Sequence, residues 1–406
     1  MGNILKILFL SHRFPYPPTR GDKIRSFNMV KHLHEQGHEV TVASMSRSPE
    51  ETAECQGINE YCHAFFLTEI NENVQNIRMV LRLLSKDPSS MGYFYSNEMA
   101  SDVKQLLHDK KFDFIMVFSS SAAQYVEHVT DTPKMLDYCD MDSQKWLAYV
   151  DYKRWPISMG YALEGKKLEA DEKRLAKKFD LGSGATDFEV ETLEEFNTGI
   201  ATGYFPNGVD SDFFKPVDVD YKKNSICFVG RMDYYPNEVC IINFCHDVLP
   251  IIREKYSDVT FKVIGAVPTK EVLDLNAIDG VEVTGTVDDI RKHAQSCEVM
   301  VAPLMIARGT QNKILEGMAM GIPVVSSHLA ARGVDAEVGE HILAATTNEE
   351  YAEEIMSIFA DGNKRDQISK AGRERVLSHH NWKRGMEMMD ECIDRTIKEF
   401  NKKGAV

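Results

Sequence analysis

The segment that decides the fold runs from residue 299 to residue 326 and reads VMVAPLMIARGTQNKILEGMAMGIPVVS. It opens on the short apolar run 299–302 and closes on a second one at 324–326, and both read as buried strands of a parallel sheet. Between them we predict a helix at 310–320. A strand, a helix and a second strand in this order predict a right-handed crossover between parallel strands.

The same alternation occurs on both sides of this segment. At the N-terminus, a strand at 4–10 leads through a proline-rich loop to a helix at 22–36, which Gly37 ends, and to a strand at 39–44. Turn-forming residues at Pro206–Asp210 mark a boundary in the pattern, so that a second α/β set follows a first. Further strands are predicted at 112–118, 134–137, 225–229, 259–264 and 281–283, and further helices at 164–179, 236–255 and 382–400.

This pattern predicts an α/β protein with two Rossmann-like, doubly wound parallel-sheet domains. We expect residues 1–205 to form the first domain, residues 206–381 the second, and a C-terminal helix within 382–406 to cross back to the first. The length of 406 residues fits two domains. Open sheets of this kind bind ligands at the carboxyl ends of their strands, so we expect the ligand site in a central cleft that both domains face.

Composition narrows the choice of partners and compartment. The formal net charge of -15 argues against non-specific nucleic-acid binding, which needs a basic surface. The eight cysteines include no C-x-x-C pair, as expected for free thiols in a reducing compartment. The apolar run at 4–10 is too short for a signal peptide or a membrane span. We therefore expect a cytoplasmic protein.

The start of the helix predicted at 310–320 has the properties of a phosphate site. Gly309 allows a close backbone approach, and Thr310 is the expected N-cap residue. The free N–H groups and the positive dipole end of the first turn attract an anion. Lys313 is unfavourable in that turn unless a bound anion offsets it, and Glu316 shares its helix face. A nucleotide site and an ordinary helix start with one surface ion pair both stay open at this point.

Residues 308–326 resemble the donor-binding signature of glycosyltransferase family 4, whose members are retaining enzymes of GT-B fold that use sugar nucleotides without a metal. The resemblance extends over most of the chain. Residues 140–146 and 309–313 are most similar to the exopolysaccharide sugar transferases associated with exosortase (PEP-CTERM) systems. The other matching segments are Arg13–Pro18 with Gly21–Asp22, Gly37–Val40, Pro206–Asp210, Phe228–Arg231 and Val283–Val287.

The resemblance implies specific roles for residues of these segments. It implies that no metal or other cofactor is needed, because the nucleoside diphosphate sugar is itself a substrate. Two positions depart from the family: Arg308 stands where many members have a glutamate that contacts the transferred sugar, and Asn237 where many have a lysine. Catalysis is assigned to Arg231, Lys313 and Glu316, and further donor contacts to Gly21, Thr286, Val287, Arg308, Gly309, Thr310, Gln311 and Asn312.

Three other motifs give weaker indications of a functional site. Asp140 and Asp142 have the D-x-D spacing of some metal-nucleotide sites, but a cleft-lining or capping role is favoured. His34 and His38 match the H-E-x-x-H zinc pattern, but Gly37 should end the helix before His38. Ser119–Ser121 end a predicted strand and are candidates for contact with the acceptor or the transferred sugar.

A basic stripe of Arg78, Arg82 and Lys86 lies beside Ile77, Leu81 and Leu84. Such a stripe fits either a solvated helix face or peripheral contact with anionic lipid at the inner face of a membrane. Both readings stay open.

We therefore expect a glycosyltransferase that moves a hexose-type sugar from a nucleoside diphosphate to a hydroxyl group of a polysaccharide or a lipid-linked glycan. A sugar-nucleotide epimerase of the same fold and a non-catalytic nucleotide- or glycan-binding module remain the alternatives.

Overall fold

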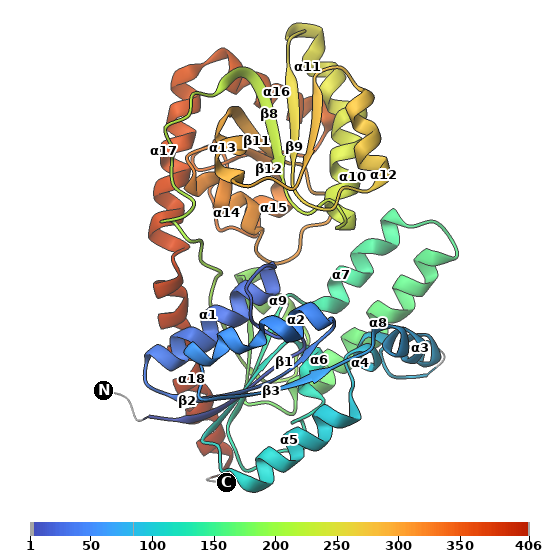
Figure 1. Ribbon diagram of the computed structural model, residues 1–406, viewed down its shortest axis with the longest axis vertical. Coiled ribbons are helices and arrows are strands. Elements are labelled where there is room, and N and C mark those ends of the chain that lie inside the picture. The colour runs from blue at the N-terminus through green and yellow to red at the C-terminus, as the bar shows by residue number, and fades with distance from the viewer. Residues whose placement is uncertain (1–3, 84, 405–406) are drawn as a thin grey trace. The chain divides into compact units, whose positions relative to one another are not determined.

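The computed structural model describes residues 4–83 and 85–404, and the chain in it divides into two compact units. Unit 1 comprises Met1–Pro206 and Gly385–Val406, and unit 2 comprises Asn207–Arg384. Each unit contains one parallel sheet with helices packed on it (Figure 1). The chain passes between the units near Pro206 and again within its last helix.

Unit 1 contains a seven-stranded parallel sheet of order β3-β2-β1-β4-β5-β6-β7. Figure 1 shows α1 and α2 on one face of this sheet and α5 on the other. The strands are β1 (Lys6–Ser11), β2 (Glu39–Ser46), β3 (Ala64–Glu69), β4 (Phe114–Phe118), β5 (Lys134–Cys139), β6 (Leu181–Gly184) and β7 (Ala201–Tyr204). The helices are α1 (Gly21–Glu35), α2 (Pro49–Glu54), η1 (Cys55–Glu60), α3 (Glu72–Arg82), α4 (Ser89–Tyr93), α5 (Asn97–Asp109), α6 (Ser120–Ala123), α7 (Asp142–Tyr149), η2 (Val150–Tyr152), α8 (Ile157–Ala176), α9 (Asp187–Glu195) and α18 (Trp382–Gly404).

Unit 2 contains a six-stranded parallel sheet of order β10-β9-β8-β11-β12-β13. Its two central strands contain the apolar runs Ile226–Phe228 and Val299–Ala302, which are completely buried. The strands are β8 (Lys222–Val229), β9 (Thr260–Ile264), β10 (Val281–Gly285), β11 (Cys297–Ala302), β12 (Val324–Ser327) and β13 (Leu343–Ala345). The helices are α10 (Tyr235–Asn243), η3 (Phe244–Val248, a π-helix), α11 (Leu249–Lys255), α12 (Lys270–Leu273), η4 (Asp274–Ala277), α13 (Ile290–Gln295), α14 (Asn312–Ala319), α15 (His328–Arg332), α16 (Asn348–Ala360) and α17 (Gly362–His379).

A buried ion pair fixes α1 to the sheet of unit 1. Arg25 and Asp137 are both completely buried, with Arg25 Nε 2.9 Å from Asp137 Oδ2. Arg25 also donates to the backbone oxygen of Phe205 at 2.8 Å, and its guanidinium lies 3.9 Å from the centre of the Phe205 ring. The apolar periodicity of this helix predicts a buried face of Ile24, Phe27, Val30 and Leu33; Val30 and Leu33 are completely buried, whereas Ile24 and Phe27 are only partly buried. Arg25 can be buried beside them because Asp137 pairs its charge and its N–H groups are hydrogen-bonded.

The last helix belongs to unit 1 over most of its length. Lys403 Nζ lies 2.9 Å from Asp180 Oδ1, and Arg395 donates to the backbone oxygen of Thr202 at 2.6 Å. His32 of α1 bonds the Asp390 carboxylate at 2.9 Å. Figure 1 shows α18, in dark red, alongside the elements of unit 1.

The predicted helix at 236–255 is interrupted by a π-helical turn at Phe244–Val248. Pro250 explains the interruption, since proline has no N–H to donate to the preceding turn and its ring would clash with it. The wider turn relieves the clash and lets the chain continue as α11.

Candidate functional site

The two sheets share one topology, and it places the candidate site of each unit. In unit 2, strands are added toward one edge of the sheet up to β10 and toward the other edge from β11, so the strand order reverses between the parallel neighbours β8 and β11. In unit 1 the strand order reverses in the same way between β1 and β4. Loops that leave the carboxyl ends of such strand pairs diverge, and the gap between them is where open α/β sheets bind ligands. In unit 2, only Gly230 separates Arg231 from the end of β8, and residues 303–311 connect β11 to α14.

Lys313 is the best-defined group at this point of unit 2. Its ammonium donates to the side-chain oxygen of Asn237, and Asn237 Nδ2 in turn donates to the backbone oxygen of Arg231 at 2.8 Å. The ammonium lies 5.1 Å from the centre of the Phe228 ring. Two contacts therefore hold the cation, one with the Asn237 amide and one with the Phe228 ring. Lys313 is partly buried, and among the described residues it forms no ion pair with Glu316, so the simple surface ion pair does not form.

Burial changes the ionisation of the pair formed by Lys313 and Glu316. It lowers the pKa of Lys313 to about 8, an effect that Cys240 and Glu316 partly oppose. It also raises the pKa of Glu316 to about 7, against the pull of Lys313. Within the described structure no hydrogen bond or ion pair engages the Glu316 carboxylate. A cation and a carboxylate that are partly dehydrated and incompletely satisfied are typical of ligand-binding positions.

The start of α14 differs from the prediction. The helix begins at Asn312, its N-cap residue is Gln311, and no described side chain caps it. Thr310, the predicted N-cap residue, lies one position too early, so its hydroxyl cannot reach the first-turn N–H groups. Among the described residues Thr310 Oγ1 has no partner, although it is buried. The uncapped N–H groups and this hydroxyl are free to bind an anion.

The remaining residues of this segment form the loop in front of α14. Gly309 has a φ of 65°, in the left-handed region that favours glycine. Gln311 Nε2 donates to the backbone oxygen of Arg308 at 3.0 Å, and Asn312 Oδ1 accepts from Asn207 Nδ2 at 3.3 Å. These contacts fix the loop against the rest of unit 2.

The loop after β8 passes very close to the loop after β9. A Cβ atom added to Gly265 would lie 1.8 Å from the backbone oxygen of Gly230, and the φ of Gly265 is 150°. Only glycine fits at this position. The close approach fixes the backbone on which Arg231 and Asn237 depend.

Among the described residues, the side chains of three predicted donor residues form no hydrogen bond or ion pair with Lys313 or Glu316. The side chain of Arg231 is 42% exposed and pairs with Asp233, with 2.8 Å between Nη2 and Oδ2. Thr286 is exposed and Val287 partly buried, and both follow β10 at the edge of the sheet. The structure brings together Lys313, Glu316 and residues 308–312. In the part of the chain that the structure describes, no hydrogen bond joins these residues to Thr286 or Val287.

Asn237 is the functional residue that sequence reasoning missed. It was noted only as a departure from an expected lysine, whereas the structure shows that it holds Lys313. One signal in the sequence points to Asn237. It lies in the first turn of the helix that follows the Gly230-Arg231 pair, and this turn starts near the carboxyl end of β8, next to the end of β11 from which the chain leads to Lys313.

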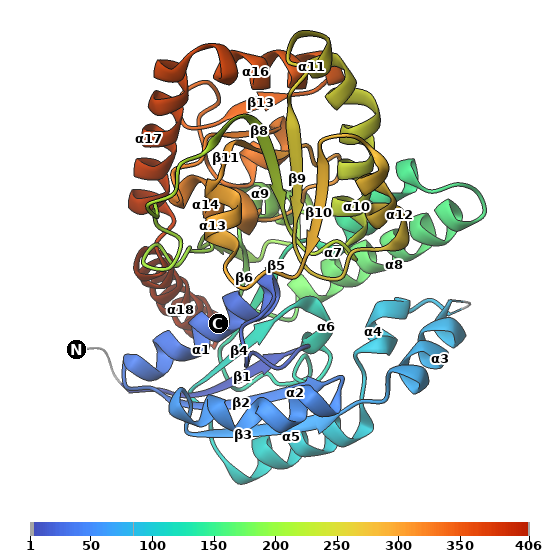
Figure 2. The same ribbon diagram turned by 45° about the horizontal axis from the view of Figure 1, so that its top comes forward.

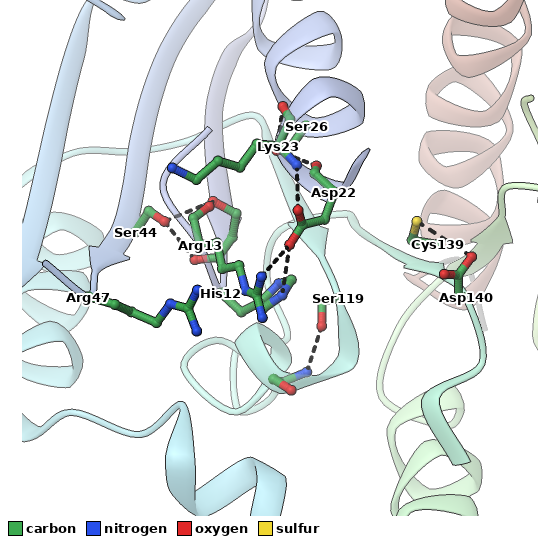
Figure 3. A network of polar contacts seen from close by, with 12 residues as sticks. His12, Arg13, Asp22, Lys23, Ser26, Ser44, Arg47, Ser119, Cys139 and Asp140 are labelled. Atoms are coloured by element: carbon green, nitrogen blue, oxygen red, sulfur yellow. Dashed lines mark hydrogen bonds and ion pairs between the residues drawn. The ribbon is translucent and has the colours of Figure 1, made fainter. Parts of the chain in front are cut away.

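The corresponding edge of unit 1 carries a cluster of cations (Figure 3). Arg13 Nη1 lies 3.2 Å from Asp22 Oδ2, and the side chain of Arg47 extends toward His12 and Arg13. The Nε atoms of Arg13 and Arg47 are buried and have no partner among the described residues. Burial and the charge of Arg13 lower the pKa of His12 to about 3, so this ring is neutral at pH 7. Gly21, the predicted contact here, is the first residue of α1, and no described side chain caps that helix.

The serines and aspartates predicted in unit 1 also lie at carboxyl ends of strands. Ser119–Ser121 are buried directly after β4, and Ser119 has a φ of 74°. Burial and nearby Glu189 raise the pKa of Asp140 to about 7. The capping role favoured for Asp140 and Asp142 is wrong, since no described side chain caps α7; Glu172 of α8 instead accepts from the Ser143 backbone N at 3.0 Å.

Neither metal pattern is supported in the part of the chain that the structure describes. No group of three or more His, Cys, Asp or Glu side chains there is arranged to hold a metal ion. Helix α1 ends at Glu35, as predicted, and His38 Nδ1 accepts a hydrogen bond from Leu5 N at 3.1 Å. The match to the zinc pattern is therefore accidental.

Comparison with known proteins identifies the fold and a domain of unit 2. Residues 223–361 match the family described as glycosyl transferases group 1. No curated protein matches the sequence significantly.

Among solved structures, Alr3699/HepE of Anabaena in complex with UDP is 15% identical, with a TM-score of 0.70, 96% of this chain covered and 100% of that one. Sucrose-phosphate synthase of Thermosynechococcus elongatus is 17% identical, with a TM-score of 0.69 and coverages of 96% and 98%. TarM is 10% identical, with a TM-score of 0.72 and coverages of 97% and 99%.

At these identities the solved structures establish the fold alone. The chain has the GT-B fold of two Rossmann-like domains, and this prediction is confirmed. The matched family covers the segment that contains Arg231, Lys313 and Glu316. The fold and the family match over residues 223–361 together support a glycosyltransferase.

Proposed function

We propose that the protein transfers a hexose-type sugar from a nucleoside diphosphate to a hydroxyl group of a polysaccharide or a lipid-linked glycan. The observation that carries the proposal is the position of Lys313: a dehydrated cation, held by Asn237, at the uncapped start of α14. A diphosphate is the ligand class that matches a cation and free N–H groups at one point. The proposal places the donor on unit 2 and the acceptor on unit 1.

In the proposed reaction the diphosphate is a leaving group that gains negative charge. The bond between the anomeric carbon and the phosphate oxygen breaks, and the acceptor hydroxyl oxygen bonds that carbon. The hydroxyl proton passes to the departing phosphate oxygen, so no protein base is required. Lys313, Arg231 and the first-turn N–H groups of α14 are proposed to stabilise the developing charge. Glu316 is proposed to accept hydrogen bonds from the ribose hydroxyls, and Thr286 and Val287 to contact the nucleobase.

Family resemblance supplies the finer parts of the proposal. They are retention of the anomeric configuration, independence from metal, membership of glycosyltransferase family 4 and a role in exopolysaccharide synthesis in the cytoplasm. Arg308, in place of the usual glutamate, is proposed to alter the contact with the transferred sugar. No described helix is long and apolar enough to span a membrane.

The proposal is tested by incubating the protein with UDP-, GDP- and dTDP-linked sugars in the absence of acceptor. We expect slow release of the nucleoside diphosphate from one class of donor, because water replaces the missing acceptor. Conversion of the donor to a different sugar nucleotide would instead identify an epimerase. Binding without any turnover would identify a non-catalytic module.

The pH dependence of donor use follows from the ionisation of Lys313 and Glu316. Glu316 ionises as the pH rises through about 7, and Lys313 loses its charge as the pH rises through about 8. We expect kcat/KM for the donor to rise through the first value and fall through the second, because kcat/KM reports the groups of the free enzyme. Lys313→Arg should shift the alkaline limb to higher pH, since arginine keeps its charge. A flat profile in wild type, or an unshifted limb in Lys313→Arg, would contradict these assignments.

A further inference from the structure

Helix α3 of unit 1 has its polar side toward the protein and its apolar side toward solvent. Gln75 is buried and donates to the backbone oxygen of Tyr95 at 3.1 Å, and Arg78 donates to the same oxygen at 2.7 Å. On the other side, Ile77 is 61% exposed and Leu81 72%. A helix that packs on a soluble core normally has the opposite arrangement. The apolar face of α3 therefore lacks a partner among the described residues.

A second exposed apolar segment lies at the start of α8. Trp155 is 79% exposed and Met159 62%. Of the 21 large apolar side chains that are exposed in the described structure, nine lie in these two segments. We call them the apolar surface: Val74, Ile77, Val80, Leu81, Leu83, Trp155, Ile157, Met159 and Leu163.

Polar contacts join the two segments into one structure. Lys167 of α8 donates to the backbone oxygens of Arg82 and Leu83 at 3.1 and 2.8 Å, and so caps the end of α3. Glu164 accepts from the backbone N atoms of Ser89 and Ser90 at the start of α4. Figures 1 and 2 both show α3 and α8 projecting from the same side of unit 1. The apolar surface is therefore a fixed feature of the fold.

The charge around the apolar surface is opposite to that of the protein as a whole. The chain has a net charge of -15, yet residues 72–88 and 151–167 contain seven basic and four acidic side chains. Lys86, Arg154 and Lys166 are exposed among the basic side chains, and Glu72, Asp87 and Asp151 among the acidic ones. A tryptophan and aliphatic side chains flanked by cations match the interface of an anionic lipid bilayer. A two-fold contact between copies of the chain would instead bring the cations of both copies together.

We propose that α3 and the start of α8 form a membrane-docking surface that binds anionic lipid. The apolar side chains enter the boundary between headgroups and acyl chains, and the surrounding cations contact the lipid phosphates. The negative charge elsewhere on the protein is repelled by the same bilayer, which favours binding through this surface. The site where lipid binds is independent of the donor site in unit 2.

The test is cosedimentation of the full chain with vesicles of phosphatidylcholine containing phosphatidylglycerol, compared with phosphatidylcholine alone. We expect binding to the anionic vesicles that weakens as salt is added. The double variant Ile77→Ser, Leu81→Ser should lower this binding about tenfold or more. The matched control is Leu273→Ser, Leu377→Ser, which changes two exposed leucines of unit 2 and should bind as wild type. Unchanged circular dichroism would show that each variant is folded.

Three results would overturn the proposal. The first is equal binding of wild type to both kinds of vesicle, or binding to neither. The second is equal vesicle binding by wild type and the Ile77→Ser, Leu81→Ser variant. The third is a dimeric wild type and a monomeric variant, neither of which binds vesicles. No donor or acceptor is present in the experiment. Its failure therefore leaves the proposed transfer reaction standing, and failure of the donor assay leaves the docking surface standing.

Discussion

Lys313→Ala is expected to lower kcat for donor cleavage by about 10²- to 10³-fold, the effect of removing one preorganised group from developing charge. The ammonium is held between Asn237 and the start of α14, where the leaving diphosphate is proposed to bind. Initial rates of nucleoside diphosphate release at pH 7, with saturating donor, measure the loss. Rates within about twofold of wild type would remove Lys313 from the mechanism.

The stability of this variant separates function from folding. Lys313 carries a positive charge that burial disfavours, as its lowered pKa shows. Removing it should leave the free energy of unfolding unchanged or slightly higher, because a dehydrated charge is lost. The control is Lys292→Ala, which removes an exposed cation of α13 and should keep both activity and stability. Unfolding of Lys313→Ala at a lower temperature would instead point to a structural role.

Glu316→Ala is expected to lower kcat/KM for the donor by roughly 10²-fold, the scale of lost hydrogen bonds to a charged group. In the described structure its carboxylate has no protein hydrogen-bond or ion-pair partner, so few protein interactions are lost with it. The dissociation constant of the nucleoside diphosphate product should rise in parallel, since the proposed partner of Glu316 is the ribose. Titration of the product into both proteins measures this.

Glu316→Gln provides the comparison for this variant. It keeps the shape and one acceptor oxygen, so it should retain more product affinity than Glu316→Ala. Wild-type affinity in Glu316→Ala, together with low turnover, would place the carboxylate on the transferred sugar and contradict the ribose assignment. Wild-type turnover would remove it from the site.

The central strands and their crossovers could be predicted because their physical signals are local. Val299–Ala302 and Ile226–Val229 are continuous apolar runs, and in the structure both form buried central strands. Strands β6 and β7 have four residues each and contain glycine, serine or threonine in place of a long apolar run. No periodicity of useful length exists in them. Their formation depends on neighbours that are distant in the sequence.

Helix α8 shows how an apolar surface misleads sequence reasoning. The predicted start at 164 excluded the turns that contain Ile157, Met159 and Leu163, and the helix begins at Ile157. These side chains remain exposed, so they do not form the buried stripe on which the prediction depended.

The candidate site was predictable in its position but not in its contacts. Lys313 is identified because a cation in the first turn of a helix is locally unfavourable, Gly309 because it allows a close backbone approach, and Glu316 because it shares the helix face of Lys313. The hydrogen bond from Lys313 to Asn237 joins residues 76 positions apart, and no sequence spacing predicts it. Thr310 failed as the N-cap residue because the N-cap lies one residue later, at Gln311, a difference that patterns do not resolve.

Proton uptake on nucleotide binding tests the central claim, that a diphosphate binds beside Lys313, most directly. At pH 8 this lysine is about half charged in the free protein, and a bound diphosphate should restore its full charge. Calorimetric titration with the nucleoside diphosphate product in buffers of different ionisation enthalpy should show uptake of about half a proton at that pH. Lys313→Arg should bind with no such uptake, because its guanidinium is already charged. Equal proton uptake in wild type and Lys313→Arg, or binding by wild type without any uptake, would contradict the claim.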